Sequence, residues 1–221
     1  MRERASPDRE EVEVWVVPLR APAGLWEVLG EEDRARAQRL IRPRDRDRFV
    51  AAHAALRLVL SRCLDAPPEQ LAFGLDDRGR PHLPAGDVGF SLSRSDGLSL
   101  IALARARVVG IDIERRAPTG QEQAIAERFF DPHDAASLSR LSGAEHAKAF
   151  FRLWCARESV AKAAGTGITA PPPPGNWSAT ALEIDADYAA AVAVAGPPLP
   201  TRIVRASWIA VEGGHPQLTA E

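Results

Sequence analysis

A chain of 221 residues that is 45% hydrophobic can bury a sizeable core, as one large domain or two small ones. Its formal net charge of −2 argues against a general nucleic-acid binder. Residues 1–11 are charged and carry no apolar signal-peptide core, and no apolar run reaches the length of a membrane span. We therefore expect a cytoplasmic protein that contacts neither nucleic acid nor membrane.

Hydrophobic patterning predicts strands and helices in the first half of the chain. Residues Val12–Val17 alternate as a strand does, after a charged stretch, residues 1–9, that we expect to be a frayed tail. Apolar residues at helical spacing then predict two helices, at Glu31–Leu40 and Arg46–Leu64. Three further strands are predicted, at Leu71–Leu75, Val88–Ser93 and Leu98–Arg105.

The second half is predicted to follow a similar order. A strand at Val108–Glu114 precedes three helices, at Gln121–Phe130, Pro132–Leu141 and Ala144–Ala164. Pro171–Pro174 is predicted to be stiff and extended. The final strands are expected at Ala179–Ile184, Ala189–Ala195 and Arg202–Ala210, and the last few residues are expected to be loose. This order predicts an α+β fold in two halves, residues 1–107 and 108–221.

The helix at Ala144–Ala164 has clear end signals. Ser142 and Glu145 form a capping-box pattern, and Gly165 is a typical residue just past a helix end. The apolar stripe from Ala147 to Cys155 continues at helical spacing into Glu158 and Lys162, so two charges point toward the core. The alternative is an ordinary i,i+4 ion pair on a solvated face.

A second motif places two carboxylates on one face of a strand. Asp112 and Glu114 are two residues apart, so they share a face, while Ile111 and Ile113 occupy the other face. An exposed end of a sheet tolerates such a pair. If the face is enclosed, magnesium is the natural partner, because it prefers oxygen ligands, and Glu158 would supply a third carboxylate.

These two motifs resemble the paired signature of the Sfp-type 4′-phosphopantetheinyl transferases, which is (V/I)G(I/V)D(I/V)E followed by FxxxWxxKE(A/S)xxK. Here the first is Gly110–Glu114, and the second runs from Phe150 through Trp154–Lys162. The family's G-(K/R)-P element, its F-N-(L/I)-S-H-S strand and its first helix are matched, in order, by Gly79–Pro81, by Phe90–Ser95, and by Arg48 and Phe49 with Arg57. The resemblance spans residues 44–167.

The resemblance implies two similar α/β halves, related by a pseudo-twofold, with the active site in the cleft between them. It implies an enzyme that transfers the phosphopantetheine arm of coenzyme A to a serine of an apo carrier protein and releases adenosine 3′,5′-bisphosphate. Magnesium would be held by Asp112, Glu114 and Glu158. Glu158 would also take the serine proton, and Lys162 would donate to the phosphates.

The resemblance also implies which residues contact coenzyme A. Those residues are Arg44, Arg57, Arg80, Ser93, Arg94, Asp112 and Lys162. The alternative for the arginines between residues 34 and 62 is a salt-bridged, solvated surface, since aspartates are interspersed among them. A nucleic-acid-binding arm is disfavoured, because no aromatic residues are interleaved with these arginines.

Two residues depart from the family pattern. Arg94 replaces the usual histidine, and Arg157 replaces the usual lysine before Glu158. Arginine is never deprotonated in proteins, so Arg157 cannot be a general base, and Glu158 is left to act as one. The substitutions also support an alternative, a non-catalytic descendant that binds coenzyme A or a carrier protein. A third interpretation, an unrelated magnesium-dependent phosphohydrolase, shares the carboxylates but not the Trp154–Lys162 pattern.

The partners implied are coenzyme A and an acyl or peptidyl carrier protein of polyketide, nonribosomal peptide or fatty acid synthesis. We expect a monomer, because each half would complete the site within one chain.

Overall fold

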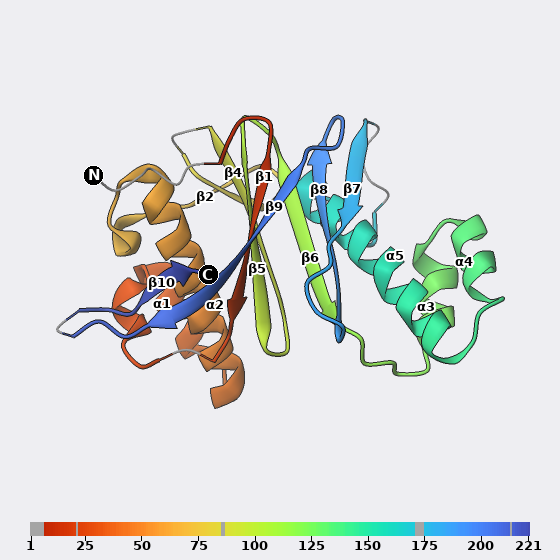
Figure 1. Cartoon of the computed structure of the whole chain (residues 1–221), viewed down its shortest axis with the longest axis horizontal. Helices are drawn as coiled ribbons and strands as arrows, with labels where there is room; N and C mark the ends of the chain where they lie inside the picture. Colours follow the sequence, from red (N-terminus) through yellow and green to blue (C-terminus); the bar gives the residue numbers. More distant parts are fainter. Residues whose placement is uncertain (1–6, 21, 85–86, 171–174, 213) are drawn as a thin grey trace.

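The computed structural model describes residues 7–20, 22–84, 87–170, 175–212 and 214–221. It stacks four layers, in the order helices, sheet, sheet, helices (Figure 1). The predicted mixed α+β class is confirmed. Most of the predicted tail, residues 1–6, and the predicted extended segment, Pro171–Pro174, lie outside the described residues.

The first sheet has five strands in the order β10-β9-β1-β5-β4. Their bounds are Gln217–Ala220, Thr201–Ile209, Val12–Pro18, Leu98–Arg105 and Val88–Ser95, respectively. Helix α2 (Pro43–Leu64) covers one face, beside α1 (Glu31–Gln38) and the short 3-10 helices Leu25–Val28 and Pro68–Gln70. Apolar side chains of α2 such as Leu60 pack there against Trp15, Val17 and Leu103 in one buried cluster.

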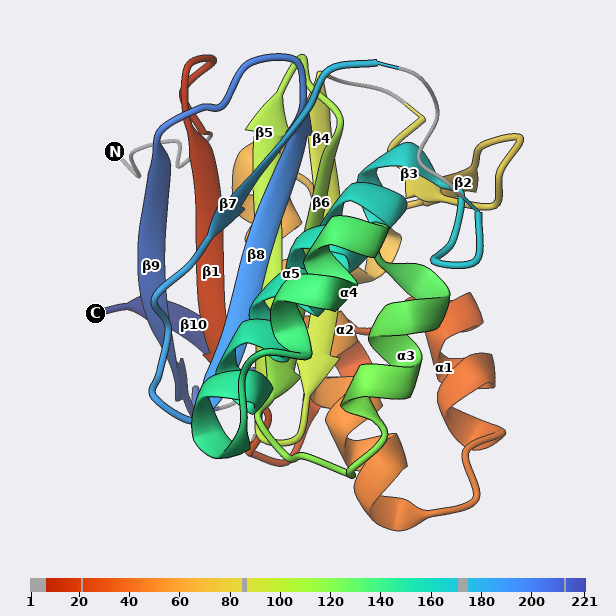
Figure 2. The ribbon, with the colours of Figure 1, turned by 90° about the vertical axis from the view of Figure 1, so that its right-hand side faces the viewer.

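The second sheet has three strands in the order β6-β8-β7, with bounds Val109–Arg115, Tyr188–Ala195 and Trp177–Ala181. Helix α5 (Gly143–Ala164) lies along its outer face, and α3 (Glu122–Phe129) and α4 (Pro132–Leu138) pack outside α5 (Figure 2). Phe150, Phe151 and Cys155 of α5 bury against Ala189 and Ala191 of β8.

The two sheets bury a shared apolar layer, which follows from the period of two along their strands. Trp15 and Val17 face α2, whereas Val14 and Val16 face the second sheet. Within β6, the isoleucines Ile111 and Ile113 face the first sheet. The alternate residues of β6, Asp112 and Glu114, are therefore turned toward α5, as the sequence predicted.

The sheets also meet edge to edge, where β4 lies beside β6. Serine hydroxyls of β4 accept the hydrogen bonds that backbone carbonyls would accept in a ladder. The amides of Ile111, Ile113 and Arg115 donate to the Oγ atoms of Ser91, Ser93 and Ser95 at 3.1, 3.4 and 3.0 Å, respectively. We call this row the serine seam. It fixes the register of the two sheets next to the acidic residues of β6.

Close contact between α5 and β6 depends on Gly110. A Cβ at this position would lie 2.1 Å from the carbonyl oxygen of Ser159 and 2.4 Å from the amide nitrogen of Ala163. Only glycine fits such an approach without displacing the helix. The contact brings the α5 turn that carries Glu158 and Lys162 against the acidic strand.

A hairpin from the first half reaches the end of α5. Its strands are β2 (Gly74–Leu75) and β3 (Pro81–His82), and its turn carries two arginines. Arg78 and Arg80 each donate from Nη1, at 2.6 Å, to the carbonyl oxygens of Ala164 and Ala163. The last carbonyls of a helix lack partners within the helix and carry partial negative charge, so arginine is well suited to them.

Several local predictions were wrong. Gln217–Ala220 is not loose but pairs with β9, because Leu218 is buried in the first core. Only Gly74–Leu75 of the predicted Leu71–Leu75 strand is a strand. Helix α2 begins earlier, at Pro43, since proline is favoured at a first helical position. Ser142 lies at the N-cap of α5 but its side chain forms no cap hydrogen bond.

The division into residues 1–107 and 108–221 stays a prediction, as does the pseudo-twofold. Strands β9 and β10 belong to the first sheet, where β9 pairs in parallel with β1. The second half of the sequence therefore contributes the edge of the first half's sheet.

Candidate active site

Strand β6 and helix α5 form the acidic wall of a cavity of about 600 Å³. Asp112 and Glu114 come from the strand, and Glu158 and Lys162 come from the helix. All four line this cavity, as the two sequence motifs predicted. Its other lining residues come from α1, α2 and β4 and the segment after α1: Arg36, Leu40, Phe49, His53, Leu92, Ser93 and Arg94.

Lys162 joins the two elements of this wall. Its Nζ lies 2.6 Å from Oδ1 of Asp112 and donates at 2.9 Å to Oγ of Ser93, which in turn donates to Asp112 Oδ1 at 2.9 Å. Asp112 is 2% exposed, and its second oxygen, Oδ2, is buried without a hydrogen-bond partner. A buried carboxylate oxygen without a partner is costly, so this atom indicates a site for an additional ligand.

Both glutamates of the wall have a raised pKa. Burial raises the pKa of Glu114, and the negative charges of Asp112 and Glu158 add to the shift, against the hydrogen bond from Ser95 and the charge of Lys162. Burial also raises the pKa of Glu158, and Asp112 adds to it, against Lys162 and Arg157. Crowded carboxylates that resist ionisation attract either protons or a cation.

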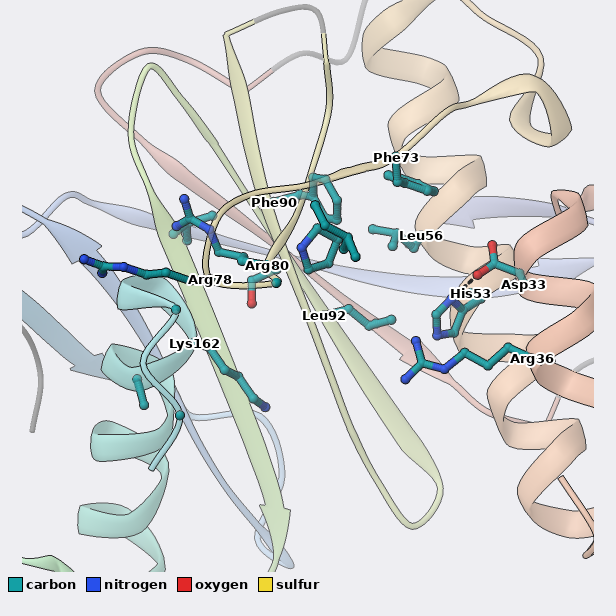
Figure 3. Close-up of a pocket in the computed structure, with 18 of the residues that line it drawn as sticks. Asp33, Arg36, His53, Leu56, Phe73, Arg78, Arg80, Phe90, Leu92 and Lys162 are labelled. Atoms are coloured by element: carbon teal, nitrogen blue, oxygen red, sulfur yellow. Dashed lines mark ion pairs between the residues drawn. The ribbon is translucent and has the colours of Figure 1, made fainter. Parts of the chain in front are cut away.

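A larger cavity of about 900 Å³ adjoins this wall (Figure 3). The two cavities share Arg36, His53, Leu92, Glu158 and Lys162, so they form one continuous cleft. Figure 3 shows Lys162 on one side of the cleft and Asp33, Arg36 and His53 on the opposite side. Apolar side chains lie between the two walls, namely Leu56, Phe73, Phe90 and Leu92.

The opposite wall is built on a buried ion-pair network. Arg57 is 3% exposed, and its Nε donates to Oδ2 of Asp33 at 2.6 Å. The same guanidinium donates to the carbonyl oxygens of Pro68 and Leu71, both at 2.9 Å. The other oxygen of Asp33, Oδ1, lies 3.0 Å from Nδ1 of His53.

Five of the seven predicted coenzyme A contacts line the cleft, and two, Arg44 and Arg57, do not. Ser93 and Arg94 line the smaller cavity, and Arg80 lines the larger one. Arg57 lines neither cavity, because its guanidinium is buried in the network just described. Arg44 is exposed and forms an ion pair with Asp96 at 3.2 Å, next to a different hollow. The structure thus does not bring Arg44 and Arg57 to the cleft.

Arg157 lies apart from the acidic wall. It lines a separate hollow with Phe130 and Asp134 and donates to the carbonyl oxygen of Ile168 at 3.2 Å. The residue before Glu158 therefore supports the loop that follows α5 in this chain.

The donor set of the acidic wall suits a hard divalent cation. Asp112, Glu114 and Glu158 offer only oxygen atoms to one cavity, and Oδ2 of Asp112 lacks a partner. As their side chains stand, no three acidic, histidine or cysteine residues in the described ranges are grouped closely enough to hold a metal ion. The chemistry of the wall fits magnesium, and its occupancy by magnesium stays a prediction.

Sequence reasoning missed several residues of the cleft. Asp33 and Arg36 lie in the stretch for which a salt-bridged, solvated surface was the alternative, and His53 lies in a helix whose spacing indicates only a core. Their approach to the cleft depends on tertiary packing. Ser91 and Ser95 had a usable signal, since they repeat at a period of two around Ser93 and so share its face.

Comparisons with known proteins identify the family of the chain. Residues 108–207 match a family model described as the 4′-phosphopantetheinyl transferase superfamily. The 4′-phosphopantetheinyl transferase HetI of Nostoc sp. is 35% identical over 212 residues, which is 85% of this chain and 89% of HetI. The protein slr0495 of Synechocystis sp. is 34% identical over 162 residues, 71% of this chain and 66% of its own length.

The 4′-phosphopantetheinyl transferase Sfp of Bacillus subtilis is 29% identical over 144 residues, 65% of this chain and 63% of Sfp. The match thus spans nearly all of HetI and slightly less than two thirds of slr0495 and Sfp.

The cleft has an acidic wall on β6 and α5 and a wall on α1 and α2 that carries Arg36 and His53, and the relatives specify the class of protein. The chain belongs to the 4′-phosphopantetheinyl transferase family. This confirms the resemblance drawn from its motifs and, at the level of the family, the predicted transfer of phosphopantetheine to carrier proteins. In the part of the chain that the structure describes, every helix is too short or too polar to cross a bilayer.

Proposed function

We propose that this chain transfers the 4′-phosphopantetheine arm of coenzyme A to a serine of an apo carrier protein in a magnesium-dependent reaction. The observation that carries the proposal is the acidic wall, where Asp112, Glu114, Glu158 and Lys162 line one cavity. Magnesium would be held by the three carboxylates, and when bound it would neutralise charge on the pyrophosphate.

The residues of the chain supply the remaining chemistry. The serine oxygen attacks the phosphorus that bears the pantetheine arm, and the bond from that phosphorus to the oxygen of the leaving adenosine bisphosphate breaks. Glu158 accepts the serine proton, and its raised pKa makes it a better base than an ordinary glutamate. Lys162 donates a charged hydrogen bond to a phosphate oxygen, where negative charge develops.

The cleft would hold coenzyme A in the orientation that the transfer requires. Coenzyme A would lie in the larger cavity, with its pyrophosphate toward Lys162 and its adenosine among the apolar side chains such as Phe73 and Leu56. Arg80 faces the same cavity, although its Nε and Nη1 already bind Asp76 and the end of α5. Held reactants lose less entropy in the reaction than free ones, which is how a positioned cleft accelerates the transfer.

The first test measures the intact mass of an apo carrier protein after incubation with this protein, coenzyme A and magnesium. We expect the mass to rise by one phosphopantetheine, and EDTA to abolish the rise. Carrier proteins from polyketide, nonribosomal peptide and fatty acid synthesis should be compared, since all three are proposed clients. No transfer to any of them, together with measurable coenzyme A binding, would favour the non-catalytic alternative.

A variant pair tests the catalytic assignment. Glu158→Gln keeps the size of the side chain but removes the base and a proposed metal ligand, so we expect transfer to slow at least about a hundredfold. Arg157→Lys changes the adjacent residue, which faces a different hollow, and should leave transfer close to wild type. Near wild-type transfer by Glu158→Gln, with an unchanged circular dichroism spectrum, would refute the assignment.

We also propose that the protein works as a monomer in the cytoplasm. The cleft is lined from both sides by one chain, which supports this proposal. Sedimentation at working concentration would test the oligomeric state.

A further inference from the structure

Three arginines converge on one carboxylate beside the acidic wall. Asp96 lies in the turn between β4 and β5, and it pairs with Arg44 and Arg48 near the start of α2 and with Arg115 at the end of β6. The nitrogen–oxygen distances to Arg44 and Arg115 are 3.2 and 2.9 Å, respectively. We call these four residues the Asp96 cluster. The proposed transfer leaves the cluster without a role.

The Asp96 cluster carries more positive charge than its carboxylate can balance. The hydrogen bond from Arg48 lowers the pKa of Asp96, burial opposes it, and the charges of the three arginines lower the pKa further. Asp96 is therefore ionised at neutral pH, and three guanidinium groups around one carboxylate leave a surplus of two positive charges. Both charges reach solvent, since the side chain of Arg44 is 74% exposed and that of Arg115 is 52% exposed.

The charged residues around the Asp96 cluster do not cancel this surplus. Its two arginines from α2 line a hollow of about 720 Å³ together with Arg20 and Asp47, which are one cation and one anion. Asp45 interacts with the charge of Arg94. On the β6 side, Glu122 is only 6% exposed and accepts hydrogen bonds from the backbone just before it. The cluster thus stays a positively charged surface.

The Asp96 cluster adjoins the acidic wall directly. Arg115 follows Glu114 on β6, Asp96 follows Ser95 on β4, and Ser95 donates to Glu114 at 2.8 Å. Glu114 lines both the smaller cavity of the cleft and a hollow of about 470 Å³ that Asp96 and Arg115 also line. The cluster therefore continues the surface of the acidic wall toward solvent, at the lower end of β6 in Figure 1.

The proposed acceptor is a serine on the surface of a folded carrier protein. A serine side chain is short, so its hydroxyl reaches Glu158 only if the surface of the carrier lies against the residues that border the acidic wall. The Asp96 cluster is among these residues. Charges at an interface attract a partner of opposite sign and fix its register. A carrier with acidic side chains beside its serine is therefore the partner that complements the charge of the cluster.

We infer that the Asp96 cluster is a docking surface for the carrier protein, and that it favours a carrier whose residues beside the modified serine are acidic. This inference rests on the proposed function, because it takes a carrier protein as the partner of the cleft. It gives Arg44 a partner other than coenzyme A, to which the family resemblance assigned it. These arginines contact the carrier but not the reacting atoms, so they determine which carrier is bound.

The experiment is titration calorimetry of the full chain, without coenzyme A, against an apo acyl carrier protein that has acidic residues beside its serine. The double variant Arg44→Gln/Arg115→Gln removes two exposed charges. Arg9→Gln is the matched control, because Arg9 is 73% exposed and pairs with Asp87, at the other end of β4. For the double variant we expect carrier binding to weaken about tenfold, the scale of two exposed charge pairs, and for the control we expect wild-type binding.

A second carrier, with those acidic residues changed to their amides, isolates the effect of charge. The wild type should bind it about tenfold more weakly than the acidic carrier, whereas the double variant should bind the two carriers alike. Added salt should weaken binding of the acidic carrier more in the wild type than in the double variant. Equal binding of both carriers by the wild type, or equal weakening in Arg9→Gln and the double variant, would overturn the inference.

Michaelis constants separate a carrier contact from a coenzyme A contact. In transfer followed by intact mass, the double variant should show a carrier KM raised about tenfold and a coenzyme A KM close to wild type. A raised coenzyme A KM with an unchanged carrier KM would overturn the inference and return Arg44 to coenzyme A. If the wild type transfers but the double variant binds the acidic carrier normally, only this inference fails. If the wild type binds the carrier through these arginines but never transfers, the proposed function fails and the docking surface stands.

Discussion

At the scale of single residues, the buried carboxylates of the acidic wall lower the stability of the folded protein at neutral pH. Glu158 and Glu114 face a cavity that already holds Asp112, and both have a raised pKa. A carboxyl group with a raised pKa in the folded state binds its proton more tightly there than in the unfolded chain. Its contribution to stability is complete at acid pH and is lost as pH rises through the folded pKa.

Glu158→Gln should therefore stabilise the metal-free protein at neutral pH. Burial is the main cause of the raised pKa of Glu158, and glutamine avoids the buried charge. We expect the melting temperature at pH 7 in EDTA to rise by about 2 °C, because partial solvation keeps the gain below about 1 kcal/mol. The gain should vanish near pH 4, where the wild-type side chain is protonated. A lower melting temperature for the variant at pH 7 would contradict this account.

Gly110 is the second residue on which the site depends. An added methyl group would meet the backbone of α5 at 2.1 and 2.4 Å, and a helix backbone cannot rotate away as a side chain can. We expect Gly110→Ala to lower the free energy of unfolding by about 3 kcal/mol and to reduce transfer, since the helix that carries Glu158 must shift.

Urea denaturation measures this change, and Gly97→Ala is the control. A Cβ at Gly97 would meet only the hydroxyl of Tyr188, at an ordinary 3.7 Å. Equal effects of the two substitutions would show that the contact between α5 and β6 is not the cause.

Residues named by local motifs were predictable from sequence, and residues brought in by packing were not. Asp112, Glu114, Glu158 and Lys162 meet because the period of two and the period of 3.6 each select a face. His53 had no such signal. A histidine in a helix also lined with alanine and leucine has the sequence signature of a core position, and only the neighbouring helix supplies Asp33.

At the scale of elements, the serine seam is the feature that holds the site together. Two strands from different sheets are joined through side-chain hydroxyls, and two of these hydroxyls, those of Ser93 and Ser95, also donate to Asp112 and Glu114. The Oγ of Ser95 accepts a hydrogen bond from the backbone amide of Arg115 and donates one to Oε2 of Glu114 at 2.8 Å. Each hydroxyl can both accept and donate, which a methyl group cannot.

Ser91→Ala tests the seam away from the acidic residues. The amide of Ile111 would lose its acceptor, so we expect a loss of about 1 kcal/mol in the free energy of unfolding. Hydrogen exchange followed by NMR should show reduced protection of the Ile111 amide in particular. Ser139→Ala is the control, because the exposed Ser139 hydroxyl donates only to a carbonyl of its own helix. Unchanged protection of Ile111 would contradict the proposed bond.

Apart from β3 and β10, the strands and long helices were predicted to within a few residues, because their apolar periods are strong. In the short hairpin that carries Arg78 and Arg80, the first strand lies within the predicted Leu71–Leu75 strand, but the second strand, Pro81–His82, and the pairing were missed. Its strands are two residues each, and their pairing, Gly74 with His82, is too brief to leave a pattern. The tertiary contact with α5 gives this segment its place, and a local window of sequence cannot contain that contact.

At the scale of the whole molecule, the first sheet depends on residues 201–220. Leu218 of β10 is 2% exposed, and its carbonyl oxygen accepts a hydrogen bond from Arg62 of α2. We expect Leu218→Ala to lower the free energy of unfolding by about 3 kcal/mol, as a buried leucine truncation does. Thr219→Ala, at the neighbouring, less buried position, should change it by less than about 1 kcal/mol.

Urea unfolding measures both variants. A change for Leu218→Ala no larger than for Thr219→Ala would show that β10 is peripheral.

The parallel pairing of β9 with β1 has a consequence for synthesis. β1 is made first, but its partner on one side is made only after every strand of the second sheet has been synthesised. Until then the nascent chain exposes an unpaired strand edge, which is the kind of surface that other chains add to. We therefore expect production at low temperature or with added chaperone to raise the yield of folded chain, because the edge of β1 stays unpaired until β9 has been made.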